Sequence, residues 1–276
     1  MSFIRYLVLI ILINLYFNAS SQRFEFGLFG GGSQFYGDLN YSMYTSISDW
    51  SVGGLYRYNI SPHISFKSFL GYTELKAGDS KHKDVWLKSR NISFFSEVLE
   101  FSQQIEFNFF HHDKKKEEYR FTPYLLSGLG VFYFNPKVNY QGREYELRTM
   151  GTEGQSSPAS SQIVYNPLQM LFIFGGGIKY SFNKNISINF EFALRKTFTD
   201  YLDDVGGLYP DEDEILRYDP VNGDVVISLS DPSSNQNIGI DNRQRSSSKT
   251  NDDYLIFGIA LTYTIHKNRP CPPVYN

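Results

Sequence analysis

Cysteine, net charge and long apolar runs are all scarce in this sequence of 276 residues. The one cysteine excludes an internal disulfide framework. Lysine and arginine number 26 against 29 for aspartate and glutamate, and a charge this close to neutral gives no reason to expect a nucleic-acid partner. After residue 21, no segment approaches the roughly 20 consecutive apolar residues that a membrane-spanning helix needs. That part of the chain is therefore not expected to contain helical membrane spans.

The amino terminus has the features of a secretory signal peptide. Arg5 precedes an apolar run from Tyr6 to Ile13, and small residues follow up to Ser21. This pattern predicts a signal peptide over residues 1–21. A membrane anchor is the alternative, but the apolar run is shorter than a helical span requires. No cysteine stands near the expected cleavage site, so a lipid-anchored protein is not expected. The exported chain is then either periplasmic or an outer-membrane barrel.

Aromatic residues are abundant, with 21 tyrosines and 24 phenylalanines. Between Ile186 and Arg195, apolar residues occupy every second position, while Glu191 and Arg195 lie on the opposite face. Strict alternation indicates a β-strand. A strand with one apolar and one charged face suits a membrane barrel, which places lipid outside and polar groups inside. The mean hydropathy of -0.33 agrees with this, because apolar and polar residues alternate.

Similar alternation recurs along the chain and predicts eight strands. They cover approximately residues 23–32, 50–58, 64–72, 99–109, 121–134, 168–180, 186–195 and 254–265. Long connections at about 37–49, 76–90, 135–167 and 200–252 alternate with shorter ones. This alternation of connection lengths predicts an all-β fold over residues 22–266. The predicted fold is an eight-stranded antiparallel up-and-down transmembrane (outer-membrane) β-barrel, with short periplasmic turns and long extracellular loops. A soluble lipocalin-like barrel is the main rival and would bury its apolar face.

The alternation also predicts which side chains face the lipid and which face the barrel interior. We expect Phe107, Phe190, Phe192 and Ile259 to face hydrocarbon, and we expect an arginine to be tolerated better at Asn189 than at these positions. We expect the following charged side chains to point into the barrel: Arg57, Glu100, Glu106, Glu191 and Arg195. In an eight-stranded barrel they would form paired plugs, and a conducting pore is the rival interpretation.

Candidate catalytic and metal-binding residues are few. None of the five histidines falls on a predicted strand, so no positioned base is expected and the chain is predicted not to be an enzyme. The run His111-His112-Asp113 could be a metal site, but the adjacent lysines oppose a cation, and a solvated turn is expected instead. The acidic stretch from Asp200 to Glu214 lacks the spacing of a calcium loop and is expected to be exposed. Its motif portion, Tyr201 to Asp204, is expected to pack over the barrel mouth. The polar stretch that follows, up to about residue 250, is expected to form no core. No cofactor is predicted.

Five separated motifs resemble a known family. They are GLFGGGSQFYGDLN, YRYNISPHISFK, FTPYLLSGLGVFYFNPK, MGTEGQ and RKTFTDYLDDVGG. Together they resemble the PorG-type family of Bacteroidota, the outer-membrane β-barrel component of the type IX secretion system. The motif residues singled out are Gly37, Asp38, Asn40, Gly151, Glu153, Tyr201, Asp203 and Asp204. The resemblance covers both ends and the middle of the mature chain, whereas residues 209–252 contain no recognised motif.

The resemblance implies a non-enzymatic part of a protein-export machine. Members of the family work with a periplasmic ring, made of a lipoprotein and a partner protein, near the outer-membrane translocon. They serve the secretion of cargo proteins and, in some organisms, gliding motility. Membrane lipids are the other expected contact. The alternative function is an outer-membrane adhesin or ligand-binding barrel that acts through its extracellular loops.

The carboxy-terminal tail, residues 267–276, carries the cysteine in the sequence Arg269-Pro270-Cys271-Pro272. The barrel topology would place this tail in the periplasm. The prolines favour an extended and accessible segment. Cys271 is then an inert thiol, a metal ligand or one half of an intermolecular disulfide, and the four residues are a candidate docking site for the ring.

Overall fold

The computed structural model describes residues 24–40, 49–81, 84–155, 157, 164–233, 238–241, 243–246 and 250–265. The predicted signal peptide lies outside the described residues. So does the tail, with its candidate docking residues Arg269, Pro270, Cys271 and Pro272.

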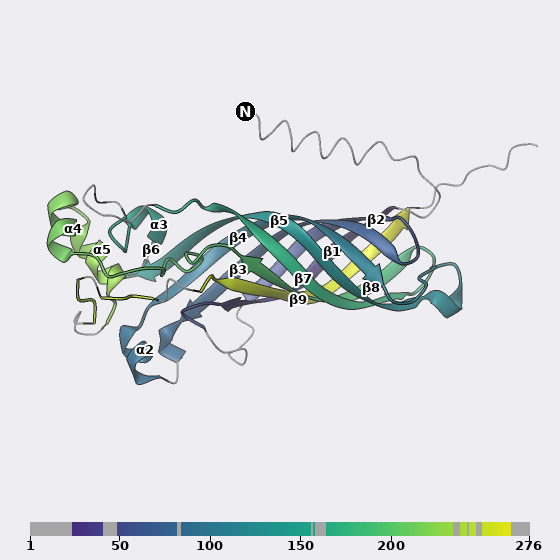
Figure 1. Ribbon diagram of the computed structural model, residues 1–276, viewed down its shortest axis with the longest axis horizontal. Coiled ribbons are helices and arrows are strands. Elements are labelled where there is room, and N and C mark those ends of the chain that lie inside the picture. The colour runs from purple at the N-terminus through teal and green to yellow at the C-terminus, as the bar shows by residue number, and fades with distance from the viewer. Residues whose placement is uncertain are drawn as a thin grey trace, which may run out of the picture.

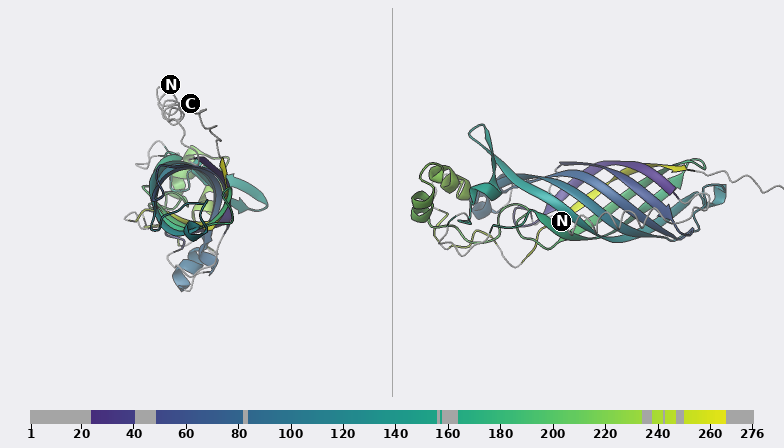
Figure 2. Two further views of the ribbon diagram at one scale, coloured as in Figure 1. Left: turned by 90° about the vertical axis from the view of Figure 1, so that its right-hand side faces the viewer. Right: turned by 90° about the horizontal axis from the view of Figure 1, so that it is seen from above.

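Eight long antiparallel strands close into a barrel (Figures 1 and 2). They are β1 (Phe24–Tyr36), β2 (Asp49–Asn59), β3 (Ile64–Gly78), β4 (Ser93–Asn108), β5 (Phe121–Tyr140), β7 (Leu168–Ser181), β8 (Ile186–Thr197) and β9 (Asp253–Ile265). Each pairs with the next along the chain, and β1 pairs with β9 to close the ring. The prediction of an eight-stranded up-and-down barrel is confirmed.

The alternation of side chains separates an apolar exterior from a polar interior. Phe107, Phe190, Phe192 and Ile259 are 48%, 50%, 56% and 41% exposed. Asn189, one position from Phe190, is only 1% exposed. A water-soluble barrel would bury its apolar face, whereas this one presents it outward. The exterior is therefore the lipid-facing surface of a membrane barrel.

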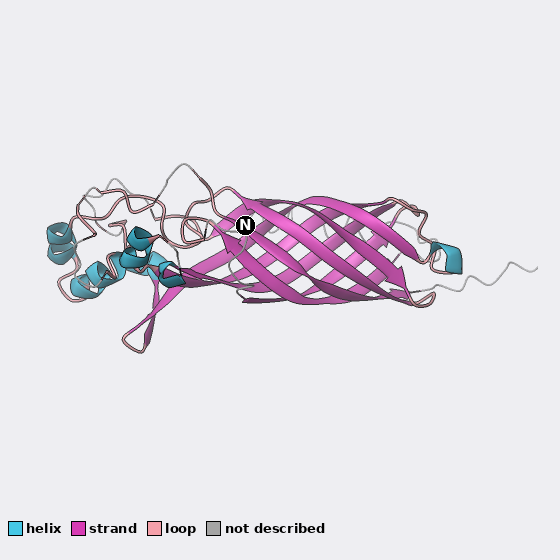
Figure 3. Ribbon diagram, turned by 90° about the horizontal axis from the view of Figure 1, so that it is seen from below, coloured by secondary structure: helices cyan, strands magenta, loops and turns pink. Residues whose placement is uncertain are grey.

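The two ends of the barrel differ in the length of their connections (Figure 3). At one end, called here the turn end, tight turns join β2 to β3 and β7 to β8, and a longer turn with a short 3-10 helix, η2 (Glu117–Tyr119), joins β4 to β5. The opposite, loop end carries β6 (Arg143–Glu146) and five helical segments. These are η1 (Asp79–Lys81), α2 (Val85–Arg90), α3 (Leu147–Met150), α4 (Glu212–Tyr218) and α5 (Gly223–Ser230). No helix in the described ranges is long and apolar enough to cross a membrane.

The long loops have more regular structure than predicted. β5 extends to Tyr140 and forms a hairpin with β6, although residues 135–167 were expected to be a connection. Part of the acidic stretch begins a helix, because the Asp211 carboxylate accepts hydrogen bonds from the backbone N–H groups of Asp213 and Glu214. Acidic residues suit the first turn of a helix, where they cap free N–H groups and complement the helix dipole.

Candidate functional site in the lumen and the loop cap

The turn-end half of the lumen is filled by a network of ion pairs. Arg57 donates to Glu25 at 2.9 Å and to Glu106 at 3.1 Å. Lys179 Nζ lies 2.6 Å from Glu106 Oε2. Lys67 Nζ lies 2.5 Å from Glu191 Oε2, and this pair joins β3 to β8, which stand on opposite sides of the ring. The network therefore crosses the lumen rather than lining its wall.

A lysine from a turn completes the network. Lys114 lies between β4 and β5, and its Nζ is 2.9 Å from Glu25 Oε1 and 2.7 Å from Thr264 Oγ1. The turn was expected to be solvated, but Lys114 is buried because its side chain folds back into the barrel mouth. A charge held away from water is tolerated only when it is paired and hydrogen-bonded. The turn end is thus held closed by side chains that satisfy one another.

The loop-end half of the lumen is mainly apolar. Phe29 and Phe69 meet edge to face at 5.7 Å, and Phe132 lies 5.5 Å from Phe134 between ring centroids. One ion pair lies among these residues: Arg195 Nε is 3.2 Å from Glu100 Oε2, which also accepts a hydrogen bond from Tyr254 at 3.0 Å. The expected inward charges Arg57, Glu100, Glu106, Glu191 and Arg195 are all buried inside the barrel.

Above the barrel, the loops form a compact structure that we call the loop cap (residues 37–40, 79–92, 141–167 and 198–252, where described). At its centre, Arg245 Nη1 lies 3.2 Å from Glu153 Oε1 and donates to the Asp204 carbonyl at 2.7 Å. The same carboxylate oxygen of Glu153 accepts the N–H groups of Gly206 and Gly207, each at 3.0 Å. Arg245 belongs to the polar stretch that was expected to form no core. That expectation is wrong, because the guanidinium group serves as a buried cross-link between loops.

A second arginine connects the remaining loops to this centre. Arg90 donates to Asp79 at 2.7 and 2.9 Å and to the Arg245 carbonyl at 2.8 Å. A longer contact of 3.5 Å reaches the carbonyl of Asp38. Arg90 and Arg245 thereby join segments from all four long connections into one unit.

The motif residues lie together in this cap. Asp204, which has a left-handed backbone (φ 63°), accepts hydrogen bonds from Thr152 and, at 2.7 Å, from Tyr165. Tyr201 stacks on Tyr165, with ring centroids 4.8 Å apart. Gly151 ends α3 with φ 68°. These motif residues come from distant parts of the sequence but lie close together in space, and they help to build the cap. The YRYNISPHISFK motif, in contrast, spans the turn between β2 and β3 at the turn end.

The first motif makes a tight turn against the start of β9. Asn40 Nδ2 donates to the Phe35 carbonyl at 2.8 Å, and the backbone N–H of Asn40 donates to the Gly37 carbonyl at 2.9 Å. A Cβ atom at Gly37 would lie 2.0 Å from Asp252 Oδ1. Only glycine permits this approach.

Three carboxyl groups near this turn have raised pKa values. Burial and the negative charge of Asp38 raise the pKa of Asp200 to about 8. For the same two reasons the pKa of Asp203 lies well above its ordinary value, and burial together with Asp203 and Asp200 raises the pKa of Asp252. The stretch beginning at Asp200 was expected to be exposed apart from its motif portion, and Asp203 and Asp204 in that portion are fully buried. Among the described residues, no group of three His, Cys, Asp or Glu side chains is arranged to hold a metal ion.

The three histidines that the structure describes, His63, His111 and His112, lie at the turn end. The rings of His63 and His111 are 6.0 Å apart, and His112 Nε2 is 3.3 Å from Ser181 Oγ. His112 Nδ1 is buried without a hydrogen-bond partner. A hydrolytic site needs a further group to orient the base, and the Ser181–His112 contact lacks one on that ring nitrogen.

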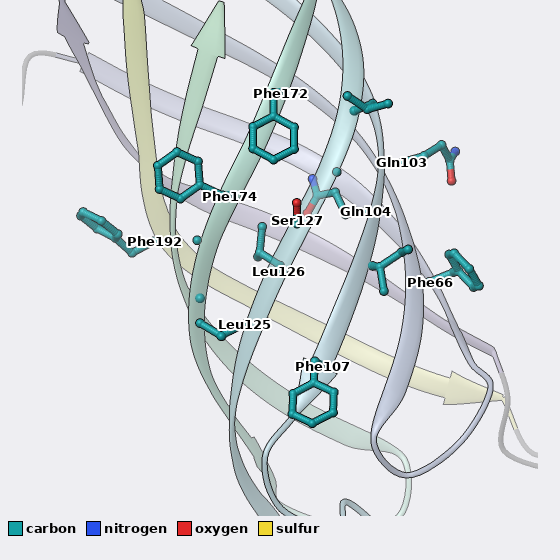
Figure 4. A pocket seen from close by; sticks show the side chains of 15 residues that line it. Phe66, Gln103, Gln104, Phe107, Leu125, Leu126, Ser127, Phe172, Phe174 and Phe192 are labelled. Atoms are coloured by element: carbon teal, nitrogen blue, oxygen red, sulfur yellow. The ribbon is translucent and has the colours of Figure 1, made fainter.

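The outer wall contains an apolar groove of about 950 Å³ across β4, β5, β7 and β8 (Figure 4). It forms because Ser127 and Gly176 occupy outward positions between large side chains. Those side chains include Phe66, Ile105, Phe107, Leu125, Leu129, Phe172, Phe174 and Phe192. The groove lies within the lipid-facing belt, where hydrocarbon covers it.

Sequence reasoning identified some of these residues and missed others. Lys179 could have been predicted to point into the barrel. In β7, every second residue after the inward-facing Leu171 and Ile173 faces the lumen, and continuing this alternation through the three glycines reaches Lys179. Lys114, Arg90 and Arg245 lie outside the periodic strands. Nothing in their local sequence distinguishes them from exposed basic residues.

Comparison with solved structures finds barrels of the same kind at low sequence identity. Neisserial surface protein A is 8% identical, with a TM-score of 0.43 over 90% of this chain and 100% of that chain. Ail, the attachment invasion locus protein of Yersinia pestis, is 8% identical, with a TM-score of 0.42 over 89% and 100%. The N-terminal β-barrel domain of Pseudomonas aeruginosa OprF is 11% identical, with a TM-score of 0.37 over 89% and 100%. These likenesses concern the fold alone.

No curated protein matches the sequence. A family described as a domain of unknown function, DUF6089, matches residues 4–225. Because this match covers most of the 276 residues, the chain belongs to the DUF6089 family.

Proposed function

We propose that this chain is a non-enzymatic outer-membrane component of the type IX protein secretion system. In this role it anchors the periplasmic ring, a lipoprotein plus its partner, to the outer membrane for the export of cargo proteins and for gliding motility in organisms that glide. The five sequence motifs support the assignment to this system. The observation that carries the scaffold role is the filled lumen, in which Lys67 and Glu191 join opposite walls at 2.5 Å.

A filled lumen supports a scaffold rather than a conduit. Ion pairs cross the turn-end half, and aromatic rings occupy the loop-end half. Cargo would have to pass beside this barrel, through the translocon. The proposal therefore expects bilayer conductance no greater than that of the empty membrane.

The turn end is the surface that would meet a periplasmic ring. Lys115, Lys116, Glu117 and Glu118 are exposed there. We expect alanine at these four positions to reduce recovery of the ring lipoprotein when the barrel is purified from detergent-solubilised outer membranes. The matched control is alanine at Asp211, Glu212 and Asp213, which are exposed in the loop cap. Normal cargo secretion in a strain that lacks this chain would refute the proposal.

The tail offers a second contact with the ring. We propose that Cys271, with Arg269, Pro270 and Pro272, docks onto the ring, either non-covalently or through a disulfide. Non-reducing electrophoresis of whole envelopes separates the two forms. A higher-mass band that reductant removes and that Cys271→Ser lacks would support the disulfide, whereas migration only as a monomer after thiol-blocking lysis would leave non-covalent docking.

The alternative, a ligand-binding barrel that acts through its loops, is favoured by one observation. The buried Arg245 and Arg90 bonds hold the loop cap in a single arrangement, and a binding surface benefits from such preorganisation. The two functions differ in which end is required: the loop-cap substitutions would abolish the activity of an adhesin and leave secretion intact.

A further inference from the structure

A polar pocket of about 480 Å³ lies between the loop cap and the loop ends of β4 and β5. The β5–β6 hairpin contributes Asn139 and Tyr140, the segment after α2 contributes Asn91, and α5 with the residues after it contributes Leu229 and Ser233. The volume falls within the range typical of small-molecule sites. The pocket uses none of the lumen residues, so it is separate from the ion-pair network.

The lining combines an apolar surface with neutral hydrogen-bonding groups. Tyr140 and Leu229 provide the apolar part. Asn91 and Asn139 provide side-chain amides, each of which can both donate and accept hydrogen bonds. A ligand that suits this lining has an apolar face and several hydroxyl groups.

One buried hydroxyl in the lining has no partner. Ser233 is 6% exposed, and its Oγ forms no hydrogen bond. A buried polar group without a partner destabilises a folded protein, so this hydroxyl is a group that a ligand would satisfy. The unsatisfied hydroxyl of Ser233 is an observation separate from the volume of the pocket, and both observations indicate a ligand at this site.

The charged groups in the lining already have partners within the protein. Arg245 is paired with Glu153 at 3.2 Å. The Asp231 carboxylate accepts the backbone N–H groups of Ser233 at 3.1 Å and Gly239 at 2.7 Å. Arg245 therefore has no free charge to offer a phosphate or carboxylate ligand, and each oxygen of Asp231 already accepts a hydrogen bond, so the lining favours a neutral ligand.

We propose that this pocket binds one residue of a neutral saccharide. The apolar face of the sugar ring lies against Tyr140, and its hydroxyls bond to Asn91, Asn139 and Ser233. The pocket is at the end opposite the short turns, so the ligand reaches it from the outer side of the membrane. This site does not depend on the secretion role and could accompany it.

Saturation-transfer NMR on the full-length folded barrel tests the site directly. Nanodiscs replace sugar-headed detergents, which would compete for the pocket. The neutral probes are the methyl glycosides of glucose, galactose, mannose and N-acetylglucosamine, and the charged probes are glucuronate and glucosamine. A single sugar this small should bind with a Kd of about 1 mM or weaker, and we expect transfer to at least one neutral probe but to neither charged one.

Variants connect that signal to the pocket. Tyr140→Ala removes the aromatic surface, and Asn139→Trp blocks the mouth from an exposed strand position where tryptophan is well tolerated. Each should weaken binding at least tenfold. Tyr140→Phe, which keeps the ring, and Arg143→Ala, on the exposed hairpin but not in the lining, should bind like the unaltered protein.

Several results would overturn the proposal: no transfer to any neutral probe, transfer to the charged probes alone, or equal transfer with Asn139→Trp. Purified lipopolysaccharide and its released polysaccharide then identify the source of the sugar. Competition by both supports recognition of the saccharide, wherever it is attached. Competition by the lipid-linked form alone would show that the lipid is recognised and would refute a sugar site.

Discussion

The turn-end and loop-end halves of the lumen are built on the same eight strands but are filled differently. Near the turns, Arg57, Lys67, Lys179 and Lys114 alternate with Glu25, Glu106 and Glu191. Near the loops, phenylalanines dominate, and a single pair, Arg195 and Glu100, remains. The stability of the turn-end half depends on each charge having a partner, and the stability of the loop-end half depends on close packing of apolar side chains.

The two halves of the lumen therefore contribute differently to the structure. A buried ion pair seldom adds net stability, but removing one member is costly because the other charge is left without compensation. The turn-end network therefore constrains which strands can face one another across the lumen. The apolar half continues into the loop cap, where Phe134, Tyr165 and Tyr201 stack in succession. The substitutions below test whether the halves respond as differently as they are built.

The largest effect is expected at Glu106, which contacts three cations. Glu106→Ala leaves Arg57, Lys67 and Lys179 with one carboxylate fewer, and we expect it to lower the free energy of unfolding by roughly 3–5 kcal/mol. Urea titration of the barrel in lipid vesicles measures this loss. Glu117→Ala, at an exposed turn position, is the control and should change stability little. Equal losses in the two variants would mean that the network does not hold the barrel.

Phe190→Arg tests the outer face and should cost roughly 2–4 kcal/mol near the membrane midplane. The same titration measures it, with Phe190→Leu as the control. That arginine is milder at Asn189 than at Phe190 stays a prediction, and the same titration tests it. Asn189 is 1% exposed in a lumen already filled by other side chains, so an arginine there should also destabilise the barrel, by overpacking.

In the loop cap, Arg245→Leu should act locally. It leaves the buried Glu153 carboxylate with only the two backbone donors of Gly206 and Gly207, at a cost of roughly 2 kcal/mol. Hydrogen exchange of peptides that contain these two glycines should become roughly 30-fold faster, while barrel peptides remain unchanged. Arg243→Leu is the control, because Arg243 lies two residues away and is exposed. In this variant the same peptides should exchange at the rate of the unaltered protein. Faster exchange throughout the barrel would contradict a separately held cap.

Phe132→Leu tests the packed half with a milder change. The substitution keeps an apolar side chain of similar size, and we expect a loss below roughly 1.5 kcal/mol. Glu106→Gln conserves shape in the charged half but removes the charge, and it should cost more. If the two conservative changes were equal in urea titrations, the proposed contrast between the halves would fail.

The smallest effect is expected from pH, through the carboxyl groups of the cap. Because the folded-state pKa of Asp200 is raised to about 8, folding favours its protonated form. That contribution is fully present below the ordinary pKa near 4 and is lost as pH rises towards 8. The cap should therefore be cleaved by proteinase K a few-fold faster at pH 9 than at pH 6. Asp200→Asn, which cannot ionise, should reduce this difference, and an unchanged pH dependence would exclude Asp200 as its origin.

The strands and the direction of their side chains could be predicted because alternation is a local property. Ile186 to Arg195 assigns its own two faces, and the same parity places Glu100 and Glu106 inside. The cap was harder to predict. Asp203 and Asp204 belong to a run of acidic residues, a pattern that usually indicates exposure, but both are buried. The hydrogen-bond donors to Asp204, Thr152 and Tyr165, lie far away along the chain.

The sequence by itself determined the barrel: the number of strands, their order, the lipid-facing surface and the alternation of short and long connections all follow from a period of two residues and its interruptions. Only the tertiary structure decided which charges meet. Lys114 reaches Glu25 from a turn, and Arg245 reaches Glu153 across 92 positions of the chain. The physical reason is that an ion pair depends on distance in space and leaves no periodic trace in the sequence.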